Sequence, residues 1–359
     1  MHLTALDLTG VRNLARVHVE PGNGINYFYG DNGAGKTSLL EAISLLSMGR
    51  SFRSGKIATI ITHNTRELTV SGEVANPLLG SSQRVGISKT RDETIVRVDG
   101  QNINRLSELA TAVPTVAIST RNHELVEGGP GERRHYIDWF LFHVDLTFVH
   151  LSKQYKTALA QRNAALRRGA ADSLVEIWNK ELVESGESIA ELREKVCAQI
   201  QSRLEMFAKD LGNPDILPQL QYRRGWAVDQ TFAEVLERSL DNCRRLGTTS
   251  TGPHRADIKL KVNGDEARYV HSRGQQKLLA ILMKLVQVDL YASHHGQAPI
   301  LLFDDMPSEL DEEAREFVLS YLKSSSVQAF LTGIDDVSKQ IQNVSKKFHV
   351  KRGEIQNMV

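Results

Sequence analysis

Cysteine is scarce in this sequence: the 359 residues contain only Cys197 and Cys243, with no C-x-x-C pair and no neighbouring histidine cluster. A disulfide framework and a structural zinc site both need more thiols at closer spacing. The sequence therefore argues against both, and we expect two unrelated buried thiols.

Long hydrophobic runs are also missing. No apolar stretch approaches the ~20 residues of a membrane span, and Met1-His2-Leu3-Thr4 lacks the basic and then apolar pattern of a signal peptide. The chain shows no internal repeat, and its 41% hydrophobic and 24% charged residues are ordinary for a globular protein. We therefore expect a cytoplasmic protein without a membrane partner. Its length of 359 residues is enough for two lobes with separate cores.

The third absence is a dominant charge of one sign. The formal net charge is +1, so any affinity for nucleic acid must come from local clusters of Lys and Arg. The candidate clusters are Arg50, Arg53 and Lys56, Arg133-Arg134, Arg167-Arg168, Arg223-Arg224, and Lys346-Lys347 with Lys351-Arg352. The alternative for each basic pair is an ordinary solvated surface.

The most informative segment that the sequence does contain is rich in glycine and lies between a β-prone stretch, 24–29, and a helical stretch, 37–48. Its residues are Gly30-Asp31-Asn32-Gly33-Ala34-Gly35-Lys36-Thr37, followed by Ser38. Strand, loop and helix are the context in which this pattern binds nucleotide phosphates, because glycines let successive N–H groups turn inward. Lys36 would reach the β- and γ-phosphates and the Thr37 hydroxyl would bind Mg²⁺. A glycine-rich turn that matches by accident is the alternative.

Two adjacent carboxylates follow a second apolar run. Residues 300–303 read as a parallel strand buried on both faces, and Asp304 and Asp305 come at its carboxyl end, where open α/β sheets place their ligands. Such a pair is costly unless a metal or a proton occupies the site. We assign Asp304 to Mg²⁺ and Asp305 to positioning or deprotonating the attacking water; a solvated acidic turn is the alternative.

A third segment, Ser272-Arg273-Gly274-Gln275-Gln276-Lys277, opens a strongly helical stretch, 278–291. A hydroxyl and a glycine at a helix N-terminus make a second anion site. The alternative is a serine that only caps a structural helix. Together the three segments predict an ATPase that binds ATP with Mg²⁺.

The order of these segments resembles the head of ABC and SMC ATPases, in which the serine of one subunit touches the γ-phosphate held by another. The blocks Gly49-Arg50-Ser51-Phe52-Arg53, Gly128-Gly129-Pro130 with Arg133-Arg134, and Thr251-Gly252-Pro253-His254-Arg255 narrow the likeness to the RecF family, over essentially the whole chain. The resemblance implies an α/β fold: an ABC/SMC-type ATPase head, a P-loop NTPase, with an inserted helical lobe.

Helical periodicity from about 132 to 211 marks that insertion, since SMC and Rad50 proteins place long coiled coils there. A helix of about 39 residues would span only ~58 Å, so we expect a compact lobe. Apolar residues at three- and four-residue spacing form a stripe that ends at Leu211. The simplest interpretation is a helix face that packs on neighbouring helices, and the alternative is a face that docks another protein. We expect a discontinuous head, 1–118 and 247–359, and a lobe, 119–246.

The resemblance also implies site residues and partners. The catalytic residues would be Lys36, Asp305 and Ser272, and the nucleotide would also contact Gly274 and Gln275. Asp305 stands where ABC ATPases usually carry Glu, so we expect slow hydrolysis, stimulated by DNA. Ser308-Glu309-Leu310-Asp311 would be the D-loop between two heads, or a helix N-cap at Ser308.

The function implied is DNA replication and repair, with a link to the SOS response. ATP would drive homodimerisation on double-stranded or gapped DNA, and the protein would help RecR and RecO to load RecA. The alternatives are an ABC-type transport ATPase subunit and a Rad50-like nuclease-associated ATPase. The Gly-Pro-His-Arg block and the large insertion disfavour the first, and the absence of a coiled coil and a zinc hook disfavours the second.

Overall fold

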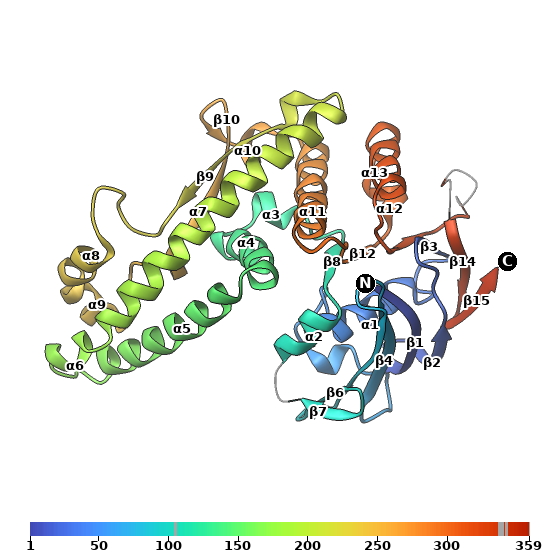
Figure 1. Ribbon diagram of the computed structural model, residues 1–359, viewed down its shortest axis with the longest axis horizontal. Helices are drawn as coiled ribbons and strands as arrows, with labels where there is room; N and C mark the ends of the chain where they lie inside the picture. The colour runs from blue at the N-terminus through green and yellow to red at the C-terminus, as the bar shows by residue number, and fades with distance from the viewer. Residues whose placement is uncertain (104–105, 337–340, 342–343, 359) are drawn as a thin grey trace. The chain divides into compact units, whose positions relative to one another are not determined.

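The computed structural model describes residues 1–103, 106–336, 341 and 344–358, without the side chain of residue 308. The chain forms two compact units: unit 1 comprises Met1–Asn122 and Lys284–Val359, and unit 2 comprises His123–Met283 (Figure 1). Residues 247–283, which we expected in the head, make their contacts within unit 2. The reason is a strand pair in which Leu260 lies opposite Leu220, so that the expected lobe completes its sheet with a strand from beyond residue 247.

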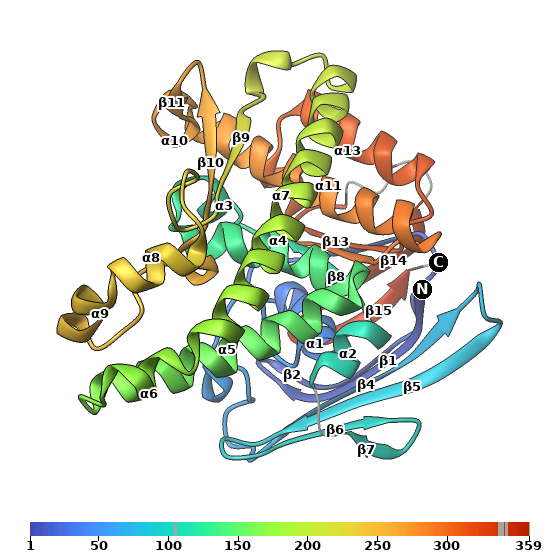
Figure 2. The same ribbon diagram turned by 60° about the vertical axis from the view of Figure 1, so that its left-hand side comes forward.

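Unit 1 contains an antiparallel six-stranded sheet in the order β2-β1-β4-β5-β6-β7. Figure 2 shows its long strands side by side. The strands are β1 (His2–Val11), β2 (Leu14–Val19), β4 (Leu68–Asn76), β5 (Ser81–Lys89), β6 (Thr94–Val98) and β7 (Gln101–Ile103). Burial alternates along β4, because successive side chains of a strand point to opposite faces of its sheet.

The second sheet of unit 1 has the order β15-β14-β3-β13-β12-β8 and is parallel except for β15. Its strands are β3 (Ile25–Tyr29), β8 (Thr115–Ile118), β12 (Ile300–Phe303), β13 (Ala329–Gly333), β14 (Val344–Lys351) and β15 (Glu354–Met358). All of β12 is buried and pairs in parallel with β8 and β13, as the apolar run predicted. The carboxyl ends of β3, β12 and β13 therefore meet at one edge.

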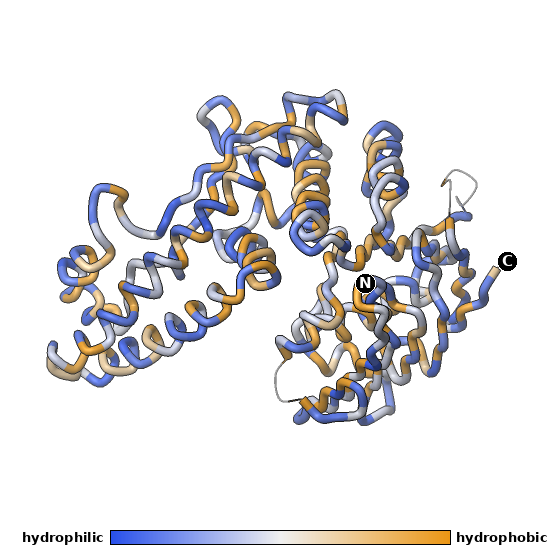
Figure 3. The backbone as a smooth tube through the Cα atoms, in the orientation of Figure 1, coloured by the Kyte–Doolittle hydropathy of each residue, from blue (hydrophilic) through white to orange (hydrophobic). Residues whose placement is uncertain are grey.

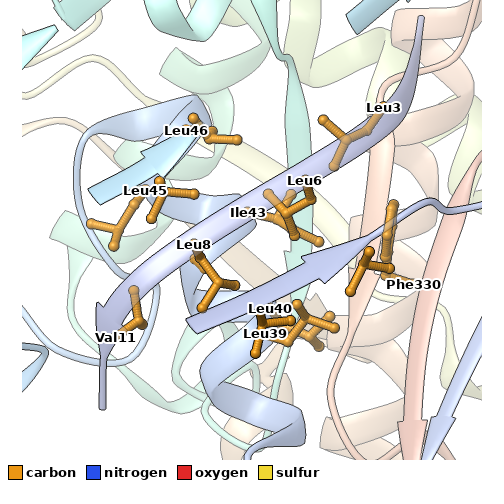
Figure 4. Packing of buried hydrophobic residues seen from close by; sticks show 14 of the residues in the cluster. Leu3, Leu6, Leu8, Val11, Leu39, Leu40, Ile43, Leu45, Leu46 and Phe330 are labelled. Carbon is orange, nitrogen blue, oxygen red and sulfur yellow. The ribbon is translucent and has the colours of Figure 1, made fainter. Parts of the chain in front are cut away.

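Helix α1 (Lys36–Met48) packs against strands of both sheets. Its apolar residues and those of β1 form one core cluster with Phe330 of β13 (Figure 4). Most of α1 is buried, polar residues such as Glu41, Ser44 and Ser47 included, so the helix has no exposed polar face. The remaining helices of unit 1 are η1 (Ile57–Thr59), α2 (Leu106–Ala112), α12 (Met306–Glu309) and α13 (Glu312–Ser324).

Unit 2 is mainly helical, with a three-stranded sheet in the order β11-β10-β9. Its longest helix, α7 (Asn179–Asp210, 32 residues), packs on α5 (Leu146–Arg167) and α4 (Pro130–Val144). Figure 3 shows apolar and polar turns alternating along α7, and the predicted stripe faces its neighbours: Leu204 is fully buried. The packed-face interpretation is thus confirmed. The other elements are α3 (Glu124–Glu127), α6 (Asp172–Glu176), η2 (Pro214–Ile216), β9 (Gln219–Arg223), α8 (Phe232–Arg238), α9 (Leu240–Leu246), η3 (Pro253–Arg255), β10 (Asp257–Val262), β11 (Asp265–Glu266) and α10 (Ala267–Val270).

Two helix breaks were not predicted. Asp145 has an extended backbone and its side chain accepts the N–H groups of Thr147 and Phe148, so it ends α4 and caps α5. Ser239 separates α8 from α9. Helix α11 (Arg273–His295) has the predicted position. Over the ranges that the structure describes, no helix combines the length and the apolarity needed to cross a bilayer.

Candidate nucleotide-binding site

The glycine-rich loop connects β3 to α1 and could not carry side chains at two of its glycines. Gly30 has φ +147° and a Cβ there would lie 2.1 Å from the Val350 carbonyl oxygen. Gly35 precedes α1 with φ +123°, and a Cβ would lie 2.6 Å from Leu14. Both backbone angles exclude ordinary side chains. The loop therefore has the backbone conformation that a phosphate loop needs. The strand before it and the helix after it disfavour the alternative, a glycine-rich turn that matches the pattern by accident.

Lys36 is the first residue of α1, and its side chain turns back over the loop. Its Nζ donates to the carbonyl oxygens of Gly30 (2.6 Å) and Asp31 (2.9 Å). Burial lowers the pKa of Lys36, and the negative charges of Asp305, Asp304 and Asp31 oppose that shift. The ammonium group is thus held at the mouth of the loop, with a third N–H that these two carbonyls do not use.

The carboxylate pair lies where the sequence predicted, at the carboxyl end of β12. The Thr37 hydroxyl donates to Asp304 Oδ1 and Oδ2, at 2.9 and 3.1 Å, and the Thr332 hydroxyl donates to Oδ1 at 2.9 Å. Burial raises the pKa of Asp304, while the bonds from Thr332 and Thr37 act in the opposite direction. Asp304 is 8% exposed. A carboxylate so little exposed to water calls for a nearby cation.

Oxygen donors from Thr37 and Asp304 suit Mg²⁺, a hard cation that takes few protein ligands and keeps the rest for water and phosphate oxygens. Among the residues that the structure describes, no group of three His, Cys, Asp or Glu side chains could enclose a metal by itself. The donor set therefore fits a metal held jointly by protein and nucleotide.

Asp305 has an unusual backbone. Its φ and ψ are 54° and 44°, in the left-handed region that non-glycine residues rarely adopt, and its N–H donates to Thr332 Oγ1 at 2.7 Å. Such strain persists only where surrounding contacts enforce it, and it clusters at functional sites. Asp305 also serves as N-cap of α12, so it lies at the turn between β12 and that helix.

These residues open onto a hollow of about 1010 Å³ in unit 1. From the predicted site, Asn32, Gly33, Gly35, Lys36, Thr37, Ser38, Asp304 and Asp305 line it. Gly30, Asp31 and Ala34 belong to the same loop without lining the hollow. Sequence reasoning missed further lining residues: Arg12, Asn13, Phe52, Ala58, Thr59, 61–65, Arg91, 119–121 and Thr332.

Asn13 shows why such residues matter. It lies in the turn between β1 and β2, donates from Nδ2 to the Gly33 carbonyl oxygen (2.9 Å) and accepts from Ser38 Oγ (2.9 Å). The phosphate loop is thus tied to the first sheet. An Asn in a hairpin turn is common, so the sequence carried no signal for this contact.

The third predicted segment lies in unit 2. Ser272 and Gly274 are exposed at the start of α11, and Gln275 is half-buried. Gln275 N–H donates to Ser272 Oγ (3.3 Å) and Ser272 N–H donates to Gln275 Oε1 (2.9 Å), which is a capping box. The capping alternative is therefore real, and it leaves the exposed helix end able to meet another molecule.

A structural part of the D-loop prediction is wrong. Ser308 lies inside α12, and the N-cap of the next helix, α13, is Asp311, whose side chain accepts the Ala314 N–H at 2.9 Å. A cap at Ser308 is excluded because its backbone is already helical. The proposed role of this segment between two heads stays a prediction.

The basic pair Arg133-Arg134 is neither a solvated surface nor a pair of cations that could both contact DNA. Arg133 is 6% exposed and binds both oxygens of Asp257, at 2.8 and 3.2 Å. Arg134 donates to the Ala256 carbonyl oxygen at 2.7 Å, and burial lowers its pKa. Arg133 therefore holds α4 to β10 inside unit 2.

Fold and site together define the class: an ABC/SMC-type ATPase head, with a P-loop between two sheets and an inserted helical part. A family model described as the RecF/RecN/SMC N terminal domain matches residues 2–356. The DNA replication and repair protein RecF of Stutzerimonas stutzeri (strain A1501) is 39% identical over 361 residues, which cover 99% of this chain and 97% of that protein. RecF of Thioalkalivibrio sulfidiphilus is 36% identical, with 99% of each chain covered. The chain therefore belongs to the RecF family.

Solved structures agree with that assignment. The RecF-ATPrS and RecF-ATP structures of the RecFOR pathway match with TM-scores of 0.87 and 0.88 at 27% and 26% identity, covering 100% of this chain and 98% of theirs. The Smc head domain from Pyrococcus furiosus matches at a TM-score of 0.58 and 17% identity, and so shares the fold.

Proposed function

We propose that this protein binds and slowly hydrolyses ATP and that the bound nucleotide joins two copies of it on DNA during replication and repair. The observation that carries the proposal is the meeting of Lys36, Thr37 and Asp304 at the mouth of one hollow. The sequence separates Thr37 from Asp304 by more than half of the chain, and a shared ligand would account for their meeting. ATP in related solved RecF structures supports the choice of nucleotide.

Each site residue has a role that its geometry supports. Lys36 would exchange its loop carbonyls for β- and γ-phosphate oxygens, and the loop N–H groups would hold the rest of the triphosphate. Thr37 and Asp304 would hold Mg²⁺, which would neutralise negative charge on the phosphates. Asp305, in its strained turn, would position or deprotonate the attacking water. Its carboxylate is one methylene shorter than the Glu usual in ABC ATPases, which supports slow turnover that DNA could stimulate.

The exposed start of α11 supports dimerisation. Around Gly274, only Ser272 Oγ would come within 4 Å of an added Cβ. No neighbour in the described part of its own chain therefore requires a glycine here, whereas close approach of a phosphate would. We propose that Ser272, Gly274 and Gln275 of one copy contact the γ-phosphate held by Lys36 of the other. Nucleotide would then act as the adhesive, and hydrolysis would release the dimer.

Family membership supports the DNA and protein partners that we propose. The dimer would hold double-stranded or gapped DNA through its phosphates, and would work with RecR and RecO to load RecA, as part of the response to DNA damage and in the cytoplasm. With a net charge of only +1, binding must rest on local clusters. Among those named from the sequence, the exposed residues are Arg50, Arg53, Lys56, Arg167, Arg168, Arg223, Lys351 and Arg352.

Analytical sedimentation tests the proposal. The wild-type protein should shift from monomer to dimer with ATP, and the dimer should co-sediment with duplex DNA. Lys36→Met should bind no ATP and stay monomeric. Ser272→Arg should bind a fluorescent ATP analogue normally and still fail to dimerise. An unchanged monomer in all conditions would refute ATP-driven assembly.

The two alternative functions receive no support. The relatives match over the full chain as RecF, and α7, at about 48 Å, is far too short for a Rad50-like arm. Nothing in the described structure favours a transport subunit.

A further inference from the structure

Glu41 is a buried carboxylate on the helix that follows the phosphate loop. It is 1% exposed and lies one turn beyond Thr37 in α1. An ionised carboxylate in such a place is costly unless paired and hydrogen-bonded. Glu41 is paired: Arg12 donates to it from Nε (2.9 Å) and Nη2 (2.8 Å), one N–H to each oxygen. This two-pronged geometry fixes the plane of the guanidinium as well as its place.

Arg12 is itself held in an unusual conformation at the rim of the hollow. Its φ is +55°, its N–H donates to the Ile60 carbonyl oxygen at 2.6 Å, and its Nη1 donates to Thr59 at 2.6 Å. The side chain is 25% exposed and lines the hollow. An arginine has five N–H donors, so those that remain are available to an anion. Glu41 thus determines where this cation stands.

A second branch leads from the same carboxylate to another arginine. Ser51 Oγ donates to Glu41 Oε1 at 2.5 Å and accepts the backbone N–H groups of Arg53 (2.9 Å) and Ser54 (3.2 Å). Arg53 also lines the hollow. Its positive charge acts to lower the pKa of Asp304, so the two groups interact electrostatically. Glu41 therefore anchors both the turn that carries Arg12 and the segment that carries Arg53.

We propose that Glu41 is a positioning residue of the nucleotide site, which holds Arg12 and Arg53 against the hollow so that both meet the phosphate chain without rearrangement. Ordering two long side chains in advance removes an entropy cost from binding. The inference rests on the proposed ATP binding and deepens it. A carboxylate with only a structural role would stabilise the fold and leave the affinity for ATP unchanged.

A double-mutant cycle separates these two roles. Wild-type protein, Glu41→Gln, Arg12→Gln and the double variant are compared in their affinity for fluorescent ATP, ADP and AMP analogues, and melting temperatures are recorded alongside. Glutamine has nearly the shape of glutamate, so Glu41→Gln removes the charge with little change in packing. If Glu41 acts through Arg12, each single change weakens ATP binding about tenfold or more. The double variant should then bind more weakly than Arg12→Gln alone, because the Arg53 branch is lost as well, but by less than the product of the two single losses.

The phosphate series gives a readout that a structural role would not move. The loss in Glu41→Gln should be largest for ATP, smaller for ADP and smallest for AMP, and should shrink at high salt. Wild-type ATP affinity in Glu41→Gln would overturn the proposal, and so would losses that multiply in the double variant.

Arg12→Lys decides the matter even if the Glu41 variant does not fold. Lysine keeps the charge but cannot span both oxygens of Glu41. The proposal requires weakened ATP binding in Arg12→Lys, and wild-type affinity would overturn it. If the wild-type protein itself binds no ATP, the proposed function fails instead, so the two failures are distinguishable.

Discussion

Thr332→Val is the change that most sharply probes the geometry of the site. Thr332 is fully buried on β13, between the strands that carry the phosphate loop and the carboxylate pair. Its hydroxyl donates to Asp304 Oδ1 at 2.9 Å and accepts the Asp305 N–H at 2.7 Å. Valine has the same shape and offers neither contact.

The expected cost follows from these two bonds. A hydrogen bond to a charged group contributes about 1.5–3 kcal/mol and a neutral one about 0.5–1.5 kcal/mol, so we expect a loss of about 3 kcal/mol in unfolding free energy. For a protein of this size, with an unfolding entropy of about 0.75 kcal/mol/K at the midpoint, that is a fall of roughly 4 °C in melting temperature. The pKa of Asp304 should rise further, because the Thr332 bond acts to lower it.

Calorimetric melting with ATPase turnover is the assay, and Thr332→Ser is the matched control. Serine keeps the hydroxyl and loses only a methyl group, so it should retain most of the stability and much of the turnover. Thr332→Val should lose both. If Thr332→Val has the melting temperature of the wild type while Thr332→Ser has a lower one, packing rather than the hydroxyl stabilises the site, and the reasoning is refuted.

Three further changes test other parts of the structure. Because burial raises the pKa of Asp304, its ionisation at neutral pH opposes folding. Metal-free Asp304→Asn should therefore melt above wild type in calorimetry at pH 7, and the gap should close as pH falls through that raised pKa. Gly30→Ala should cost about 3 kcal/mol in urea unfolding, since its Cβ would collide with Val350, whereas Gly33→Ala, with nothing within 4 Å, should cost only about 1 kcal/mol; equal losses would contradict this. Arg133→Gln should lower the free energy of unfolding by roughly 3–5 kcal/mol, because it breaks the buried pair with Asp257. In the folded protein it should leave unchanged the slope of log K for duplex binding against log salt concentration. If Arg133 contacted a DNA phosphate, the substitution would instead reduce that slope by about 1.

Much of the site was predictable because its residues are adjacent in sequence and their chemistry is specific. The glycines with Lys36 and Thr37, and the apolar strand that ends in Asp304 and Asp305, each form a short pattern with few other uses. The structure places both at the same sheet edge. Their individual roles in catalysis stay predictions.

The residues that sequence reasoning missed share one property: their importance comes from contacts between distant segments. Thr332 is an ordinary strand residue until β13 lies between β3 and β12. Asn13 gains its role only when the first hairpin meets the loop, and Glu41 only when Arg12 and Ser51 reach it. Local pattern carries no information on such pairings.

The second boundary of the helical part shows the same limit. We expected the chain to return to the head at residue 247. Cross-strand pairing of β10 with β9 instead keeps residues up to Met283 within unit 2. Arg133 was misread for a similar reason, since its partner Asp257 lies far along the chain.

Mixing two inactive variants gives the most direct test of the central claim, that each ATP lies between two copies. Lys36→Met retains its own Ser272, and Ser272→Arg retains its own phosphate loop, so the pair can rebuild one complete site. We predict that neither variant alone dimerises with ATP, and that the mixture forms a heterodimer with one bound nucleotide. A mixture of two folded variants that stays monomeric with ATP would contradict the account.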